Sequence, residues 1–426
     1  MMGVCSSNRR SIINSEHSSL TINITFNGRR LVLEDNQNQI NPDNAAKEIS
    51  GVWEVVKSTG QIPCERSGHA VAVQQGKAFL FGGYGGTNPS HLSDFYSFDF
   101  DTQKWKVINS TNGPCPRTAF AMCVTPESFV YLWGGTDHDL QGLEDQELYE
   151  YDIYNSKWRV VETLNKGILD LRYFGRSASY HDKKIYYFGG GVKGGRFTNE
   201  LIVLDLHRIR WERVETTGDI PCPRYKHQAC VVENKLYVIG GGCYLPPEEI
   251  LDVYCLCLKT WVWSKIETLG TTPEGRAAHA CEYDPITHSI YMWGGFNQSL
   301  VPLFDFYKLD LNTFEWSNPA ILATVEENST WPGRSFHASC FHGGALYSFN
   351  GSDGESRYSD LMKFQIHHSP ARLTDYAIMA LRSSEQQGLT DIVTDPKVLP
   401  SELRKEFRDL KGLKRSPNHT QRVPYS

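Results

Sequence analysis

Short apolar runs that end in a pair of glycines recur at a nearly constant interval along the chain. The pattern is found six times, with Asn replacing the first glycine in the last copy: Phe81-Gly82-Gly83, Trp133-Gly134-Gly135, Phe188-Gly189-Gly190, Ile239-Gly240-Gly241, Trp293-Gly294-Gly295 and Phe349-Asn350-Gly351. The first five pairs begin 52, 55, 51 and 54 residues apart. Apolar runs bounded by turn residues predict β-strands, and the interval predicts a repeated structural unit.

Two further residue types recur in phase with the glycine pairs. A tryptophan follows each of the first five pairs, and an arginine precedes all six. The tryptophans are Trp105, Trp158, Trp211, Trp263 and Trp316, and the arginines are Arg66, Arg117, Arg176, Arg224, Arg276 and Arg334. Each unit then predicts four short strands: one after the arginine, one ending in the glycine pair, one such as 95–99, and one holding the tryptophan. Six such units predict an all-β fold, a six-bladed β-propeller over residues 51–368.

The two ends of this repeat array are predicted to meet in one blade. The sixth unit has no tryptophan of its own, whereas Trp53 lies 52 residues before Trp105 with no complete unit ahead of it. A strand over residues 52–57 is therefore expected to be the outer strand of the last blade. Such a strand would close the ring and remove an open sheet edge.

The segments on either side of the array have different patterns. Residues 1–50 are rich in Asn and Ser and predict a disordered segment, in which Met2-Gly3-Val4-Cys5-Ser6-Ser7 matches a lipidation pattern if Met2 is the initiator. After the last unit the period becomes helical. Leu373, Ala377 and Leu381 lie on one face of a first predicted helix, and Leu399, Leu403 and Phe407 on one face of a second, with Pro400 in its first turn. Residues 411–426 predict a basic disordered tail.

Composition narrows the classes of function. The 426 residues include 43 Lys and Arg against 49 Asp and Glu, a net charge of −6, which argues against nucleic-acid binding over the whole surface. No apolar run is long enough for a membrane span, and the N-terminus has no apolar secretory segment, so a cytosolic or nuclear protein is expected.

No motif predicts a catalytic, metal or cofactor site. The cysteines lack the paired spacing of a zinc site, and Gly190 to Gly195 is glycine-rich but is not followed by a helix, as a phosphate loop would be. Copper oxidases built on similar repeats are the alternative class. Copper needs ligands that converge irregularly, whereas His69, His227, His279 and His337 recur in register three residues after an arginine. The arginines are therefore expected to make a shared structural contact, with these histidines as hydrogen-bonded residues of the inner strands.

Six such repeats followed by Ser369-Pro370-Ala371-Arg372-Leu373 and then Leu399-Pro400-Ser401-Glu402-Leu403 resemble the kelch-domain-containing substrate receptors of cullin-2 RING ubiquitin ligases. Within that family, the fourth unit is most similar to the branch called kelch domain-containing protein 10. The resemblance implies that residues 369–410 bind elongin C, in complex with elongin B, and cullin-2 through Leu373, Ala377, Leu381, Leu399, Pro400, Leu403 and Phe407. Pro370 departs from the family pattern, which has leucine there.

The resemblance also implies a ligand site for protein C-termini, commonly ending in glycine, on the top face of the propeller. In these receptors the pocket is formed by the loops after the glycine pairs and by residues at the start of the inner strands. Lys193 and Arg196 are the candidate clamp for the terminal carboxylate, because theirs is the only such loop with two cations. The other candidates are Tyr84, Tyr225, Arg334, Ser335 and Phe336. The alternative function is a non-enzymatic kelch scaffold, for example a cytoskeletal or signalling adaptor, whose helices only cap the fold.

Overall fold

The structure is a computed structural model that describes residues 20–26, 29–35, 53–137, 142–169, 172–243, 250–319 and 333–366. In these residues the protein is nearly all-β, because the one helical element is a single 3-10 turn, η2 (Lys166–Ile168). This agrees with the fold class predicted from the apolar runs. Six antiparallel sheets of four main strands carry the repeat.

The first five sheets each take their four main strands in chain order from one repeat unit, and the sixth adds a strand from before the first unit. Sheet one contains β6 (Ala70–Gln74), β7 (Lys77–Phe81), β10 (Phe95–Asp99) and β11 (Lys104–Val107). Sheet two contains β12 (Ala121–Val124), β13 (Phe129–Trp133), β14 (Tyr149–Asp152) and β15 (Lys157–Val160). Sheet three contains β17 (Ser177–His181), β18 (Lys184–Phe188), β21 (Leu201–Asp205) and β22 (Arg210–Val214).

The second half of the chain repeats this order. Sheet four contains β24 (Gln228–Val232), β25 (Lys235–Ile239), β26 (Val253–Cys257) and β27 (Val262–Lys265). Sheet five contains β29 (Ala280–Asp284), β30 (Ser289–Trp293), β31 (Phe306–Asp310) and β32 (Glu315–Ser317). Sheet six contains β33 (Ala338–His342), β34 (Ala345–Phe349), β35 (Leu361–Gln365) and β3 (Trp53–Val55).

Short strands extend these sheets or form small ones beside them. Parallel pairs on the outer strands of sheets one, four and five come from β4 (Thr59–Gly60), β23 (Thr217–Gly218) and β28 (Leu269–Gly270). One small sheet joins β5 (Arg66–Ser67), β8 (Tyr84–Gly85) and β9 (Ser90–His91), and another joins β16 (Tyr173–Phe174), β19 (Gly191–Val192) and β20 (Arg196–Phe197). The loops after the first and third glycine pairs are therefore folded as hairpins.

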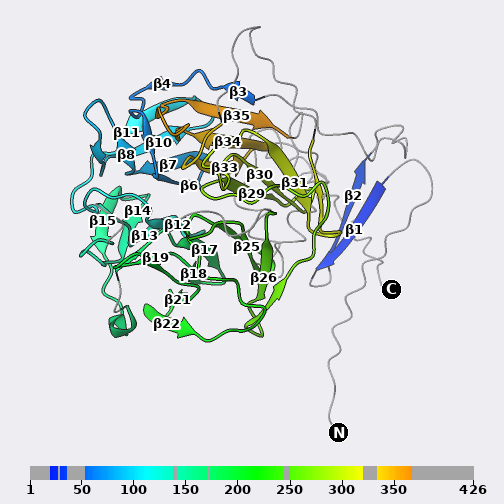
Figure 1. The fold of residues 1–426 in the computed structure, drawn as a ribbon. Coiled ribbons are helices and arrows are strands. Elements are labelled where there is room, and N and C mark those ends of the chain that lie inside the picture. The colour runs from blue at the N-terminus through cyan, green and yellow to red at the C-terminus, as the bar shows by residue number, and fades with distance from the viewer. Residues whose placement is uncertain are drawn as a thin grey trace, which may run out of the picture.

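The six sheets follow one another around a common centre (Figure 1). The first strand of each sheet contacts the first strand of both neighbouring sheets, in the order β6, β12, β17, β24, β29 and β33, and β33 contacts β6 again. The residues just before these six strands are thereby brought together, although about 50 residues separate each from the next in the sequence.

Sheet six is completed by the N-terminal strand, as the position of Trp53 predicted. β3 pairs antiparallel with β35, and Trp53 lies opposite Phe364. The Trp53 side chain is buried, with its ring centroid 5.4 Å from those of Trp293 and Phe364. Val56 also donates its backbone N–H to the carbonyl of Leu361. The first and last described strands of the array thus belong to one sheet.

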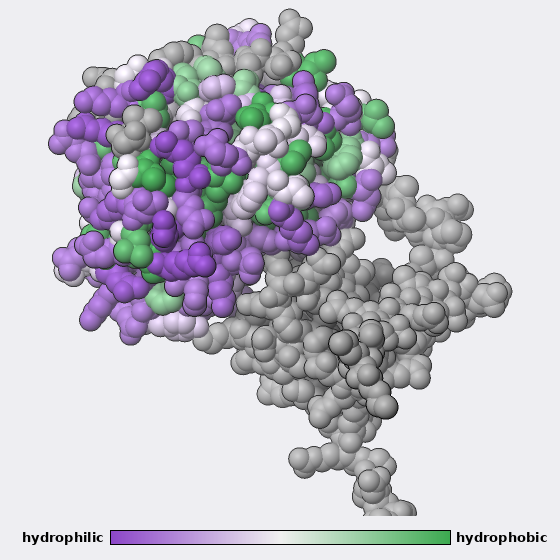
Figure 2. All heavy atoms as spheres, turned by 90° about the horizontal axis from the view of Figure 1, so that it is seen from below, coloured by the Kyte–Doolittle hydropathy of each residue, from purple (hydrophilic) through white to green (hydrophobic). Residues whose placement is uncertain are grey.

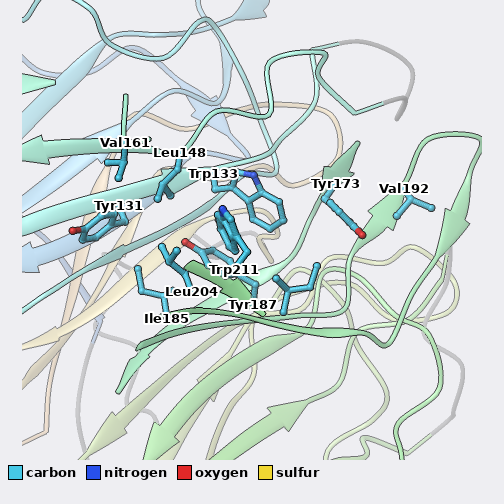
Figure 3. Close-up of a cluster of buried hydrophobic side chains, with 12 residues drawn as sticks. Tyr131, Trp133, Leu148, Val161, Tyr173, Ile185, Tyr187, Val192, Leu204 and Trp211 are labelled. Atoms are coloured by element: carbon cyan, nitrogen blue, oxygen red, sulfur yellow. The ribbon is translucent and has the colours of Figure 1, made fainter. Parts of the chain in front are cut away.

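The core is divided into clusters that lie between neighbouring sheets. Between sheets two and three, Trp133 packs against Trp211 with ring centroids 4.8 Å apart, and Tyr187 lies against both (Figure 3). Comparable clusters join every other pair of neighbours, including sheet six with sheet one. Burying one tryptophan contributes about 4–6 kcal/mol of gross hydrophobic free energy. The repeated tryptophans therefore hold the sheets to one another.

The glycine pairs are required by close backbone packing. Gly82 has φ +62°, and a Cβ there would lie 2.9 Å from the carbonyl oxygen of Arg117 in the next unit. The exception in the sixth unit is explained by Asn350, which has φ +53° and donates from its side chain to the Tyr358 carbonyl at 3.0 Å. Asparagine tolerates the left-handed region better than most residues, because its short side chain bonds locally.

The N-terminal segment differs in part from its prediction. β1 (Leu20–Phe26) and β2 (Arg29–Asp35) form an antiparallel pair, so the expectation of disorder over residues 1–50 is wrong for these residues. Apolar residues alternate through Leu20, Ile22, Ile24 and Phe26, and Asn27-Gly28 follows, which is a hairpin signal in the sequence. The lipidation motif, the two predicted C-terminal helices and the basic tail lie outside the described residues.

The surface seen from below is mainly hydrophilic, with hydrophobic residues scattered singly or in small groups (Figure 2). Scattered apolar residues are normal on a folded protein. No helix in the described part of the chain is long and apolar enough to cross a membrane.

Candidate functional site

A cavity of about 520 Å³ lies at the centre of the six sheets, where the inner strands begin. Six equivalent residues surround it, each placed two positions before the first strand of its sheet: Gly68, Ala119, Gly175, Lys226, Ala278 and Phe336. All six have φ between +49° and +66°. We call this cavity the central pocket. Its volume is in the range of sites that bind small ligands or short peptide segments.

A chain of backbone hydrogen bonds links these six positions from one sheet to the next. Gly68 N–H donates to Phe336, Ala119 to Gly68, Gly175 to Ala119, Ala278 to Lys226, and Phe336 to Ala278, over 2.5 to 3.2 Å. The links hold the backbone of the pocket wall in the left-handed conformation. Since that conformation is costly for residues other than glycine, the surrounding structure must enforce it.

Lys226 and Phe336 give the wall of the pocket its chemical character. The other four wall positions carry glycine or alanine, which leaves space in front of them. The Lys226 Nζ lies 4.5 Å from the ring centroid of Tyr225, 4.6 Å from that of Phe336 and 5.1 Å from that of Phe296. Three aromatic faces therefore hold one ammonium group at the pocket.

Among the described residues, the Lys226 ammonium has no hydrogen-bond or ion-pair partner. Burial lowers its pKa to about 8, because a charged amine is poorly solvated there. The electron-rich ring faces favour the charged form and oppose this effect. The side chain is thus a cation positioned without a counter-ion, and an anionic ligand would supply one.

The residue after each wall position forms a second layer, which is His69, Phe120, Arg176, His227, His279 and His337. The prediction that the four histidines are hydrogen-bonded is met only by His227, whose Nε2 lies 3.0 Å from Ser177 Oγ. Both ring nitrogens of His69, His279 and His337 lack a hydrogen-bond partner among the described residues. Burial lowers the pKa of His227 and His337 to about 3, so these rings are neutral at physiological pH.

Five of the repeated arginines make one shared structural contact, which was expected of Arg66, Arg224, Arg276 and Arg334. Arg224 shows the pattern: its guanidinium donates to both carboxylate oxygens of Asp252 at 2.7 Å and to the Gly240 carbonyl at 2.9 Å. Its Nε donates to the Cys222 carbonyl at 3.1 Å. Burial alone would lower the pKa of Arg224, but the bonds and charge of Asp252 raise it. The equivalent pairs are Arg66–Asp94, Arg117–Asp145, Arg276–Asp305 and Arg334–Asp360.

Arg176 does not belong to this set, which corrects the sequence alignment of the third unit. Tyr173 occupies the arginine position there, since it pairs with Val192 as Arg66 pairs with Gly85. Arg176 stands three residues later, in the second layer. It reaches Glu200 and the Tyr187 carbonyl at 3.3 Å each, and its Nε has no partner among the described residues. Burial lowers its pKa to about 10.

Aromatic residues line the pocket, and Arg357 contacts one of them from outside the lining. Tyr225 stacks on Phe197 with ring centroids 4.6 Å apart, and Tyr84 contacts His91 at 5.1 Å. The Arg357 guanidinium lies 4.7 Å above the Tyr84 ring. Asp and Glu are absent from the described residues that line the pocket. Nor does any group of three His, Cys, Asp or Glu in the described ranges have an arrangement that could hold a metal ion.

Comparison with known proteins places these features in a family. The family described as "KLHDC2/KLHL20/DRC7 Kelch-repeats domain" matches residues 34–190, 85–282 and 242–377, which is most of the chain. The chain belongs to the kelch-repeat family. Kelch-repeat domains are generally non-catalytic and bind proteins, so the match supports a protein-binding kelch domain.

Relatives of two kinds are about a quarter identical to this chain over the aligned residues. Kelch domain-containing protein 10 is 26% identical in Xenopus tropicalis and 25% in Homo sapiens, over 61% and 60% of this chain and 66% and 60% of those proteins. Acyl-CoA-binding domain-containing protein 5 of Arabidopsis thaliana is 26% identical over 72% of this chain. The chain covers 47% of that plant protein and less than two thirds of the others. The predicted similarity to kelch domain-containing protein 10 is confirmed at 25–26% identity.

The central pocket brings together some of the predicted ligand residues and leaves others out. Tyr84, Tyr225 and Phe336 line it, as proposed from the sequence. Arg334 and Ser335 are buried beside it, in the Asp360 pair and in hydrogen bonds with Ser352. The predicted elongin and cullin contacts at Leu373, Ala377, Leu381, Leu399, Pro400, Leu403 and Phe407 lie outside the described residues.

Lys193 and Arg196, the predicted carboxylate clamp, are exposed on the hairpin of β19 and β20 and do not line the pocket. Sequence reasoning missed Lys226 instead. A usable signal was present, because this wall position carries Gly or Ala in four units and a long charged side chain in only one. Alignment on the arginines puts Ala178 in place of Gly175 in the third unit, which leaves this signal unchanged.

Proposed function

We propose that the six sheets form a closed six-bladed kelch propeller that acts as a protein-binding receptor, with the central pocket as its site for protein C-termini. The observation that carries this proposal is the Lys226 ammonium, which is half-buried and unpaired in a pocket whose described lining contains no carboxylate. A terminal carboxylate would supply the missing negative charge. Neutral histidines and aromatic walls would surround the last residues of the ligand.

The size of the pocket favours small final residues. Gly68, Ala119, Gly175 and Ala278 leave room at the wall, and Tyr84, Tyr225 and Phe336 offer flat apolar faces to a peptide backbone. A charge-assisted hydrogen bond to a carboxylate contributes about 1.5–3 kcal/mol when solvent is largely excluded. Loss of that contact should therefore weaken binding by roughly tenfold or more.

Peptides with free and amidated C-termini test this site directly. We expect a glycine-ended peptide to bind the full chain and its amide to bind at least about tenfold more weakly. In Lys226→Met the acid and amide forms should bind alike, because the cation is gone. Lys193→Met is the matched control and should keep the preference. Equal affinity of the two peptides for the unmodified chain would contradict a carboxylate site.

We further propose that the receptor is the substrate-recognition subunit of a cullin-2 RING ubiquitin ligase, held to elongins B and C and cullin-2 through residues 369–410. The resemblance of Leu399-Pro400-Ser401-Glu402-Leu403 to a cullin-binding segment supports this proposal, and the relationship to kelch domain-containing protein 10 is compatible with it. Affinity capture from cells should recover the elongins and cullin-2 with the full chain. They should be lost with Leu373→Asp combined with Leu403→Asp, while peptide binding is retained. Capture without them would favour the kelch scaffold instead.

A further inference from the structure

A further cation, Arg357, comes from a different sheet than Lys226 and contacts two residues that line the central pocket. Arg357 belongs to the loop between Gly351 and β35, in sheet six, and reaches across to the small sheet of β5, β8 and β9. Its Nε donates to Ser67 Oγ at 3.3 Å, and its guanidinium lies above the face of Tyr84. Ser67 and Tyr84 both line the pocket.

The contacts of Arg357 fix the guanidinium without using up its hydrogen-bonding capacity. Stacking on Tyr84 occupies one face of the group, and Ser67 takes the single Nε–H. The two terminal nitrogens, with four N–H donors, have no partner among the described residues. The two terminal nitrogens form the edge of a guanidinium group that binds a carboxylate through two parallel hydrogen bonds.

The other arginines near the pocket differ in this respect. The terminal nitrogens of Arg66 and Arg334 donate hydrogen bonds to Asp94 and Asp360, and both arginines are buried. Arg357 is half-buried and has no acidic partner in the described part of the chain. A ligand with a single carboxylate on Lys226 would leave it without a counter-ion.

We propose that the central pocket selects protein C-termini that carry Asp or Glu a few residues before the last, with the terminal carboxylate at Lys226 and the acidic side chain at Arg357. This inference rests on the proposed function, because it takes Lys226 as the site of the terminal carboxylate. The two cations come from sheets four and six, which are separated by sheet five. The two cationic groups lie over different rings, Lys226 over Phe336 and Arg357 over Tyr84, so each is assigned its own carboxylate.

Paired peptides test the inference. Fluorescently labelled peptides with a free C-terminus would carry Glu or Gln at each of positions two to five from the end, and their dissociation constants would be measured by polarisation with the full chain. We expect Glu to bind at least about tenfold more tightly than Gln at one or two of these positions. The preference should disappear in Arg357→Gln and be partly kept in Arg357→Lys, which retains a charge but not the planar fork.

Arg196→Gln is the matched control, because Arg196 is an exposed arginine in another loop after a glycine pair. It should keep the full preference for Glu, and melting curves should show that each variant is folded. Equal binding of Glu and Gln peptides at every position would overturn the inference, as would a Glu preference that survives in Arg357→Gln. If amidation weakens binding while Glu and Gln are equivalent, the inference fails alone. If amidation has no effect, the proposed function fails as well.

Discussion

Lys226 is placed where its charge costs stability. Its neighbours are three aromatic rings, its backbone has φ +56°, and no described acid balances the ammonium. A residue retained for packing alone would be better replaced by an apolar side chain of the same length, whereas a residue that binds an anion needs the charge. The conflict between stability and charge is thus evidence for a binding role.

Lys226→Met is therefore expected to raise the free energy of unfolding by about 1–2 kcal/mol at pH 7, in the absence of ligand. The pKa of Lys226 is lower in the folded than in the unfolded chain, so the wild type gains stability as pH rises from about 8 towards 10.5. The advantage of the variant should shrink over that range. Urea denaturation at pH 7 and pH 10 measures both effects. A variant that is less stable than the wild type at pH 7 would assign Lys226 a structural role.

At the scale of elements, five of the six sheets are preceded by an arginine whose guanidinium group ties three segments together. In sheet four, Arg224 joins the chain before β24, the end of β25 at Gly240 and the start of β26 at Asp252. The pair is deeply buried, with the Asp252 side chain 5% exposed. Removing one partner leaves a buried charge unpaired, which is costly.

We expect Arg224→Met to lower the free energy of unfolding by about 3–5 kcal/mol, since Asp252 would remain buried without its cation. Arg176→Met should cost clearly less, because Arg176 makes only two long hydrogen bonds and Glu200 keeps contacts with Arg213 and Tyr173. Chemical denaturation of the two variants compares them. Equal losses would show that the two arginines have the same role after all.

Sequence periodicity predicted these elements well but placed one arginine, Arg176, out of register. The strands, the glycine pairs and the tryptophans have a period that is set by local pattern, so they could be counted. Arg176 is an arginine, but it stands three positions after the place that the repeat gives this residue type. Only the pairing of Tyr173 with Val192 shows that Arg176 is out of register. The spacing of one residue type does not establish strand register, because register is decided by the partner strand.

At the scale of the whole molecule, the contact between sheet six and sheet one joins the two ends of the array. The β3 strand supplies the outer edge of sheet six, and Val56 packs in the cluster that joins sheets six and one. Stability of the array should therefore depend on a few residues near the N-terminal end.

Deletion of residues 51–58 is expected to abolish cooperative unfolding, and Trp53→Ala to lower the free energy of unfolding by about 3–5 kcal/mol. The Trp53 side chain is 4% exposed, whereas Val55 on the same strand is 46% exposed, so Val55→Ala is the control and should change stability little. Thermal melting followed by circular dichroism measures all three. A deletion that melts like the full chain would contradict the role of β3.

The sequence by itself determined the all-β class, the six units, the strands of each unit and the strand at Trp53 that completes the sixth, because these depend on local apolar pattern and a constant period. It also indicated Tyr84, Tyr225 and Phe336 as pocket residues. Only the tertiary structure decided that Lys226, and not Lys193 or Arg196, faces the pocket, and that Arg357 reaches Tyr84 and Ser67 from another sheet. The physical reason is that the pocket wall is made of single residues, one from each sheet, held in a left-handed conformation by hydrogen bonds between sheets. In five units this residue stands two positions after the repeated arginine, and only the pairing of neighbouring strands shows that Gly175 takes that place in the third.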